Sequence, residues 1–106
     1  MNTKVKEVTI GHRELLDTIQ IIHIMKTVNA EKEDVDEAMY LDSLIYTVLS
    51  EVHIQKDGCI VELDNETRFG IWLCLDTYKD FLIDCAITED LDDCNKLLAA
   101  FGGPAE

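Results

Sequence analysis

The sequence predicts an α+β fold, with an antiparallel helix pair, a small antiparallel β-sheet (a hairpin or a three-stranded meander) and a C-terminal helix. Two observations support this prediction. Apolar residues recur at helical spacing in residues 12–28, 33–53 and 88–101, and the pattern changes to alternation after the turn signal Asp57-Gly58. The predicted order along the chain is therefore helix, helix, two or three strands, helix.

The first helix is predicted over residues 12–28. Its apolar residues divide between two faces, which indicates a helix that is covered on more than one side. The branched side chains of residues 18–22 are also compatible with a strand. The short connection Asn29-Ala30 follows, and a connection of this length favours an antiparallel arrangement with the next helix.

Residues 33–53 carry the strongest helical signal. Apolar residues repeat there at intervals of three and four and form one stripe that faces a core. This stripe consists of Ala38, Leu41, Ile45, Val48 and Val52. Acidic residues crowd the start of this helix, where they complement the positive end of the helix dipole. A structural role therefore explains those acids in part.

Alternating residues after the turn predict strands over 59–63 and 68–76, with residues 64–67 closing the hairpin. Trp72 makes the second face of the later strand partly apolar, so this strand is expected in the middle of the sheet or beneath a helix. A third strand is compatible with residues 81–87.

Residues 74–86 also have a helical interpretation. Their apolar side chains fall within one helical arc, while Asp76, Asp80 and Asp84 line up on the opposite side at steps of four. For residues 74–86 the strand interpretation is preferred, and the helical interpretation stays open as the alternative. The final helix is clearer, because Thr88 is a suitable N-cap and the glycines before Pro104 are a stop signal.

The charge balance excludes whole classes of function. Nine Lys and Arg against 22 Asp and Glu give a net charge of −13 at pH 7, whereas nucleic acids and anionic membranes require clustered cations. We therefore expect no direct nucleic-acid binding and no membrane binding. At 106 residues the chain is expected to be a single domain over 1–106. Because no export signal is recognisable, a cytoplasmic protein is expected.

No motif indicates catalysis or a cofactor. The four cysteines lack Cys-x-x-Cys spacing and lie among apolar neighbours, as small buried residues do. The three histidines are far apart in the sequence, and both serines lie inside a helical pattern without a nearby glycine. We expect no catalytic residue, no metal ion and no cofactor, and a small metal-dependent enzyme is the least favoured alternative.

Clustered acidic residues are the feature that stands out. A helical row of carboxylates at steps of four repeats every ~6 Å, which is comparable to two phosphate steps of ~3.4 Å along a DNA strand. Such a row could mimic nucleic acid in a basic groove, although acids on a solvated face also aid solubility. The residues expected to contact a partner are Asp34, Asp36, Glu37, Asp80, Asp84, Asp90 and Asp93.

The favoured hypothesis is a non-enzymatic inhibitor or antidote that covers a basic surface of a partner protein, such as a nuclease. Crowded acids repel one another, and clustered Lys and Arg on a partner would relieve that repulsion. In size and charge alone, the chain resembles small acidic inhibitors of phages and mobile elements and the immunity proteins of nuclease toxins. The alternative is a homo-oligomer, such as a homodimer, with an apolar interface, because helix 12–28 and the strand around Trp72 carry much apolar surface.

Overall fold

The computed structural model describes residues 5–103, which form helices and an antiparallel sheet. The elements are β1 (Val5–Ile10), α1 (His12–Glu31), α2 (Val35–Glu51), β2 (Val52–Gln55), β3 (Gly58–Asp64), α3 (Asn65–Asp84) and α4 (Leu91–Phe101). The α+β class, the helix pair and the C-terminal helix are confirmed. The order differs from the prediction, because a strand precedes the helix pair and a further long helix follows the sheet.

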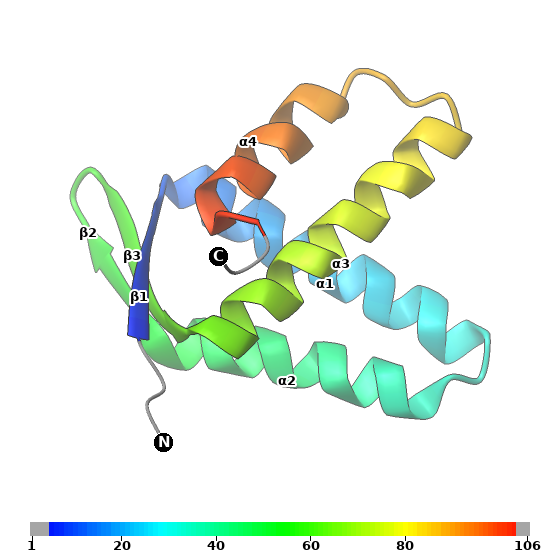
Figure 1. The fold of residues 1–106 in the computed structure, drawn as a ribbon, viewed down its shortest axis with the longest axis horizontal. Coiled ribbons are helices and arrows are strands. Elements are labelled where there is room, and N and C mark those ends of the chain that lie inside the picture. The colour runs from blue at the N-terminus through cyan, green and yellow to red at the C-terminus, as the bar shows by residue number, and fades with distance from the viewer. Residues whose placement is uncertain (1–4, 104–106) are drawn as a thin grey trace.

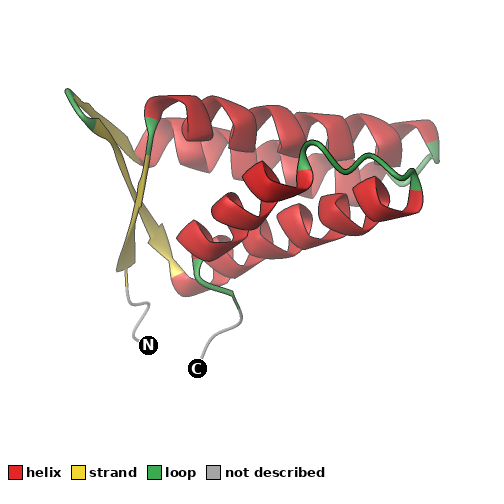
Figure 2. Ribbon diagram, turned by 90° about the horizontal axis from the view of Figure 1, so that it is seen from above, coloured by secondary structure: helices red, strands yellow, loops and turns green. Residues whose placement is uncertain are grey.

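The helices form two layers beside the sheet. Figure 1 shows the sheet at one end of the molecule, with α3 and α4 in front of the pair α1 and α2. Figure 2, seen from above, separates these two layers. The connection between α1 and α2 and the end of α3 lie at the end opposite the sheet in both views. The molecule therefore has a sheet end and a helix end.

The sheet is a hairpin completed by a strand from the start of the chain, not a meander. Its order is β1-β3-β2, and both neighbours pair antiparallel with the central strand β3. The predicted strand 59–63 and the turn at Asp57-Gly58 are confirmed. The strand β1 was not predicted from the sequence. Only Val8 and Ile10 are buried in it, so its alternating pattern is too short to stand out.

Helix α3 corrects the largest error of the sequence interpretation. The predicted hairpin loop 64–67 and the strands 68–76 and 81–87 are wrong, because residues 65–84 form one helix. Its start is fixed by Asp64, whose side chain accepts a hydrogen bond from the backbone N–H of Thr67 at 2.7 Å. Helical spacing also connects the buried residues Ile71, Cys74 and Leu75. The alternative helix over 74–86 is confirmed as far as Asp84.

The C-terminal end of α4 agrees with the prediction, whereas the predicted N-cap Thr88 is wrong by two residues. The helix begins at Leu91 with Asp90 as N-cap, so Thr88 lies just outside it, and the carbonyl of Thr88 accepts from the N–H of Leu91 at 3.2 Å. Gly102 ends the helix in the left-handed conformation at φ 87°, which glycine adopts without strain. Pro104 lies outside the described residues.

Arg68 ties the start of α3 to the end of α4. Only 1% of this residue is exposed. Its guanidinium donates to the side-chain oxygen of Asn65 at 2.7 Å, to the carbonyl of Gly103 at 2.7 Å and to the carbonyl of Phe101. The carbonyls at the end of a helix otherwise lack partners, and a cation is favourable at that end. The sequence interpretation had placed Arg68 in a strand.

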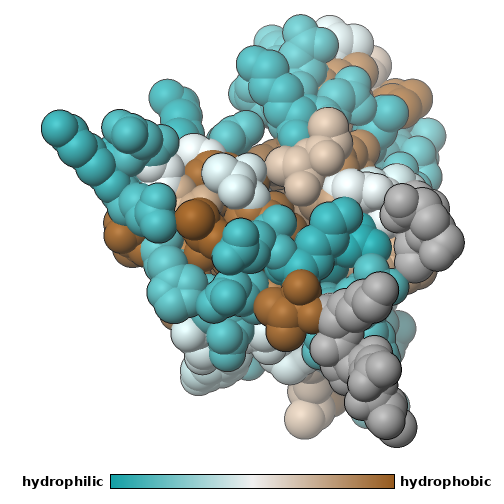
Figure 3. Space-filling view, turned by 60° about the vertical axis from the view of Figure 1, so that its left-hand side comes forward, coloured by the Kyte–Doolittle hydropathy of each residue, from teal (hydrophilic) through white to brown (hydrophobic). Residues whose placement is uncertain are grey.

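The apolar core lies between the helix layers and continues under the sheet. Its fully buried members include Ile22 from α1, Val48 from α2, Val61 from β3, Ile71 from α3 and Phe101 from α4. At the sheet end, Figure 3 shows mostly hydrophilic residues around separate apolar patches. Within residues 5–103, no helix is both long and apolar enough to cross a membrane.

Candidate protein-binding surface

The acidic residues predicted to contact a partner lie in three segments of the structure. Asp34, Asp36 and Glu37 surround the start of α2, Asp80 and Asp84 end α3, and Asp90 and Asp93 begin α4. All seven are exposed. The first two segments lie at the helix end of the molecule, away from the sheet (Figure 1).

The acids at the start of α2 stabilise that helix. The Asp34 side chain accepts a hydrogen bond from the N–H of Glu37 at 3.2 Å and so acts as the N-cap. Asp36 and Glu37 occupy the first turn, where negative charge interacts favourably with the positive end of the helix dipole. Folding alone accounts for the presence of these three acids.

The acids at the end of α3 have the opposite relation to their helix. Asp80 and Asp84 lie in its last two turns, and no basic residue occupies the last turn. The carbonyls at a helix C-terminus carry negative partial charge, so a carboxylate there is unfavourable. Folding gives no reason for Asp80 and Asp84, and this distinguishes them from the acids that begin α2.

Within residues 5–103, no ion pair includes any of the seven residues. Among the described residues, two ion pairs form, Lys26 with Asp42 at 2.9 Å and His53 with Glu62 at 2.9 Å. Neither pair includes a residue of the three acidic segments. The predicted contact residues therefore present their charge to solvent.

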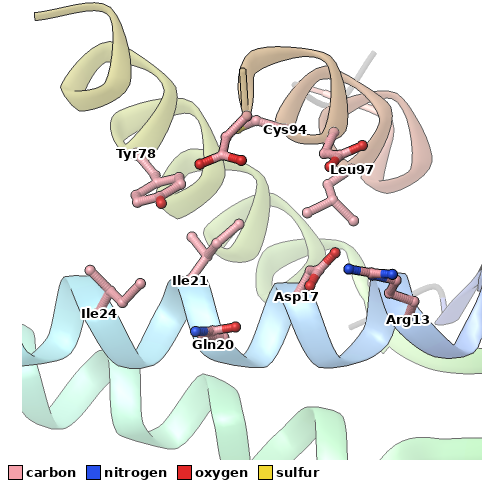
Figure 4. A pocket seen from close by; sticks show the side chains of 10 residues that line it. Arg13, Asp17, Gln20, Ile21, Ile24, Tyr78, Cys94 and Leu97 are labelled. Carbon is pink, nitrogen blue, oxygen red and sulfur yellow. The ribbon is translucent and has the colours of Figure 1, made fainter. Parts of the chain in front are cut away.

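A cavity of about 240 Å³ lies beside the start of α4 and is enclosed by α1, α3 and α4 (Figure 4). Asp90 and Asp93 line it, together with Arg13 and Asp17 of α1. Tyr78 and Cys94 face it from α3 and α4, as Figure 4 shows. The structure therefore brings two of the predicted contact residues together with an arginine and a third carboxylate.

The reactive side chains of this cavity are held in their neutral forms. Burial raises the pKa of the Cys94 thiol, and its Sγ donates to the carbonyl of Leu75 at 3.5 Å. Burial and then the carboxylate of Asp90 raise the pKa of the Tyr78 hydroxyl. A thiolate is the nucleophilic form of cysteine, so these shifts oppose nucleophilic chemistry at neutral pH.

A second cavity, of about 440 Å³, lies between the α1–α2 connection and α3 and includes Asp34 and Glu37. Its floor is Gly70 and Cys74 of α3. Burial, and then Glu37, raise the pKa of Cys74 to about 12, so this thiol also stays protonated. Asp36, Asp80 and Asp84 line neither cavity. Within residues 5–103, no group of three or more His, Cys, Asp and Glu side chains could hold a metal ion.

Sequence analysis missed an apolar face on the outer side of the helix pair. Leu16 and Ile19 of α1 lie there beside Ile45, Tyr46 and Leu49 of α2. The sequence did give one signal, because the apolar residues of the first helix divide between two faces. In the structure Leu15, Ile21 and Ile22 of α1 are buried, while Leu16 is 66% exposed.

The seven acidic residues are thus exposed in three separate segments, and none of them forms an ion pair among the described residues, although Arg13 lines the same cavity as Asp90 and Asp93. Comparison of the chain with protein-family models, with curated proteins and with solved structures finds no match in any of the three.

Proposed function

We propose that the protein binds a basic surface of a partner protein through the carboxylates at its helix end and blocks that surface. The observation that carries the proposal is the position of Asp80 and Asp84. Both are exposed at the C-terminal end of α3, where they oppose the helix dipole and have no ion-pair partner among the described residues. Residues that cost stability are best explained by a contact that uses them.

The spacing of these acids favours a surface that ordinarily holds nucleic acid. Asp76, Asp80 and Asp84 follow one another at steps of four along α3. Equivalent atoms on such a row are ~6 Å apart, similar to two phosphate steps of a DNA strand at ~3.4 Å each. The partner of this proposal is therefore a nuclease or another nucleic-acid-binding protein, and the protein acts as its inhibitor or antidote.

The cavity beside α4 gives the same surface a specific contact. Asp90 and Asp93 stand at its rim, and Ile21, Ile24 and Leu97 supply apolar walls. A lysine or arginine of the partner has a long aliphatic stem and a charged end, which match such walls and carboxylates. Asp80 and Asp84 then attract the partner, while this cavity fixes one of its side chains.

The proposal is tested by capture from a lysate of the source cells with matched charge-reversal variants. The test variant is Asp80→Lys/Asp84→Lys, and the control is Glu7→Lys/Glu51→Lys, which changes the net charge equally at exposed positions near the sheet. We expect the wild type and the control to retain the same basic protein and the test variant to lose it.

The captured partner is then purified and its affinity measured at increasing salt. Because the Debye length falls from ~10 Å at 0.1 M to ~3 Å at 1 M, attraction between opposite charges weakens strongly over this range. Equal retention by the test variant, or an affinity that does not change with salt, would contradict the proposal.

A further inference from the structure

The outer face of the helix pair carries a continuous apolar surface. Two adjoining cavities, of about 640 Å³ and 340 Å³, lie along it and share Asp42 and Tyr46. The apolar side chains on which the inference depends are Leu16, Ile19, Met39, Ile45, Tyr46 and Leu49. We call these residues the outer face. They come from both helices, so the surface follows the seam between α1 and α2.

The outer face is open to solvent although it is apolar. Leu16 and Met39 are each 66% exposed and Tyr46 is 68% exposed. Single exposed apolar residues are ordinary on protein surfaces, whereas a contiguous patch marks a contact site. Residues 16–30 of α1 extend about 22 Å, and two adjacent helices are about 20 Å wide, so the side of the helix pair that carries the outer face spans roughly 400 Å² in projection.

The charge of the outer face separates it from the acidic surface. Apart from His23, the charged residues that line the two cavities of this face are Lys26 and Asp42, and they form an ion pair at 2.9 Å. In a chain of net charge −13, the two charges of this pair cancel on this face. A basic partner has no electrostatic reason to choose it, whereas a second copy of the same acidic chain can approach here with little repulsion.

We infer that the outer face is the interface of a homodimer with two-fold symmetry. A two-fold axis brings the same patch of both copies together. We place the axis between Lys26 and Asp42, because Asp42 lies where the two cavities meet. Lys26 of one copy then faces Asp42 of the other, and the reverse contact forms by symmetry. The dimer goes beyond the proposed binding function because it uses the opposite layer and leaves the end of α3 exposed in both copies.

The area of the outer face determines how strongly the two copies are expected to associate. Stable interfaces bury about 800 Å² on each partner. The outer face is smaller in projection, so we expect a reversible dimer with a dissociation constant in the micromolar range. Sedimentation equilibrium from low micromolar to near-millimolar concentration should show the mass rising from 12.0 kDa towards twice that value. A mass that stays at the monomer value throughout would overturn the inference.

A matched pair of variants locates the interface. Leu49 on the outer face is 55% exposed and Ile83 on α3 is 52% exposed, and both lie on helices. Leu49→Glu buries a carboxylate in the dimer and should weaken it by at least about tenfold. Ile83→Glu should dimerise like the wild type. Equal dimerisation of the two variants would place the contact elsewhere and overturn the assignment.

The ion pair gives a second test, which does not depend on apolar contacts. The swap Lys26→Asp/Asp42→Lys keeps opposite charges within one copy, so it should dimerise with itself. Mixed with the wild type, it places like charges opposite each other across the axis. Native mass spectrometry should therefore find fewer mixed dimers than random pairing gives, and random pairing would contradict the two-fold arrangement.

The dimer and the proposed partner binding can fail separately. Asp80→Lys/Asp84→Lys should dimerise at least as strongly as the wild type, because it reduces the net negative charge away from the outer face. Leu49→Glu should still capture the basic partner. A Leu49→Glu variant that loses the partner while remaining monomeric and folded would mean that the outer face is instead the partner's binding site.

Discussion

The start of α2 and the end of α3 carry similar clusters of acidic residues with opposite effects on folding. At the start of α2, Asp34 caps the helix and its neighbours interact favourably with the helix dipole. At the end of α3, Asp80 and Asp84 face the negative end of the dipole with no basic residue in the last turn. Composition cannot distinguish the clusters, because both are short runs of exposed carboxylates.

The difference shows which acids are informative about function. A residue that stabilises its own helix is explained by folding, so it says little about a partner. A residue that opposes folding requires another explanation, and for Asp80 and Asp84 that explanation is a cationic contact. The comparison therefore predicts opposite changes in stability when acids of the two clusters are removed.

The largest expected effect concerns the end of α4, which receives the buried cation of Arg68. Arg68→Met should lower the free energy of unfolding by about 3 kcal/mol, because it leaves the carbonyls of Phe101 and Gly103 without their charged donor. Urea denaturation followed by circular dichroism measures the change. A loss of stability below about 1 kcal/mol for Arg68→Met would mean that a cation at the C-terminal end of a helix contributes little. The contrast drawn between charges at the two helix ends would then be too weak to explain Asp80 and Asp84.

Helix α2 approaches α3 closely at Gly70, between the two acidic clusters in the sequence. A Cβ at Gly70 would collide with the hydroxyl of Tyr40, and because this half-exposed side chain can turn aside, Gly70→Ala should cost at most about 1 kcal/mol. Adding Tyr40→Phe removes that hydroxyl and should restore part of the loss. Thermal denaturation of the single and double variants measures this coupling, and additive effects would show that Tyr40 is not the obstacle.

Removal of the N-cap of α2 tests whether the acids at the start of this helix stabilise it. Asp34→Ala should reduce the free energy of unfolding by about 1 kcal/mol, because the N–H of Glu37 loses its acceptor. Asp34→Ser, which keeps a capping oxygen, is the matched control and should lose less. An unchanged stability for Asp34→Ala would remove the structural explanation for this cluster.

Removal of the last acid of α3 tests the unfavourable cluster and should have the smallest effect. Asp84→Asn should raise the free energy of unfolding by about 0.3–1 kcal/mol at low ionic strength, and added salt should reduce the gain. Asp36→Asn, at the start of α2, should change stability in the other direction. Loss of stability in Asp84→Asn would reverse the comparison and weaken the proposed function.

Much of the helical structure was predictable because a single apolar stripe has only one good interpretation. Residues 33–53 and 88–101 carry such stripes, and both helices are confirmed within a few residues. The strand over 59–63 was predictable because a turn signal precedes it. The β1 strand was not, because its two buried residues are too few to establish alternation.

Helix α3 was misread because its sequence satisfies two periods at once. Phe69, Ile71 and Leu73 alternate as in a strand, while Ile71, Cys74 and Leu75 also follow helical spacing. The hydrogen bond from the backbone N–H of Thr67 to the side chain of Asp64 marks the start of the helix, and it is seen only in the folded structure. For the same reason the sequence could list Asp80 and Asp84 as candidates but could not place them at a helix C-terminus.

The division of the molecule into a sheet end and a helix end has a practical consequence. The start of β1 and the end of α4 both lie towards the sheet, away from the end of α3 and the α1–α2 connection (Figure 1). A linker fused at either side of the described chain would therefore anchor the molecule by its sheet. Attached to a sensor chip or to a neighbouring module in this way, the protein would display its free carboxylates outward, where an analyte can reach them.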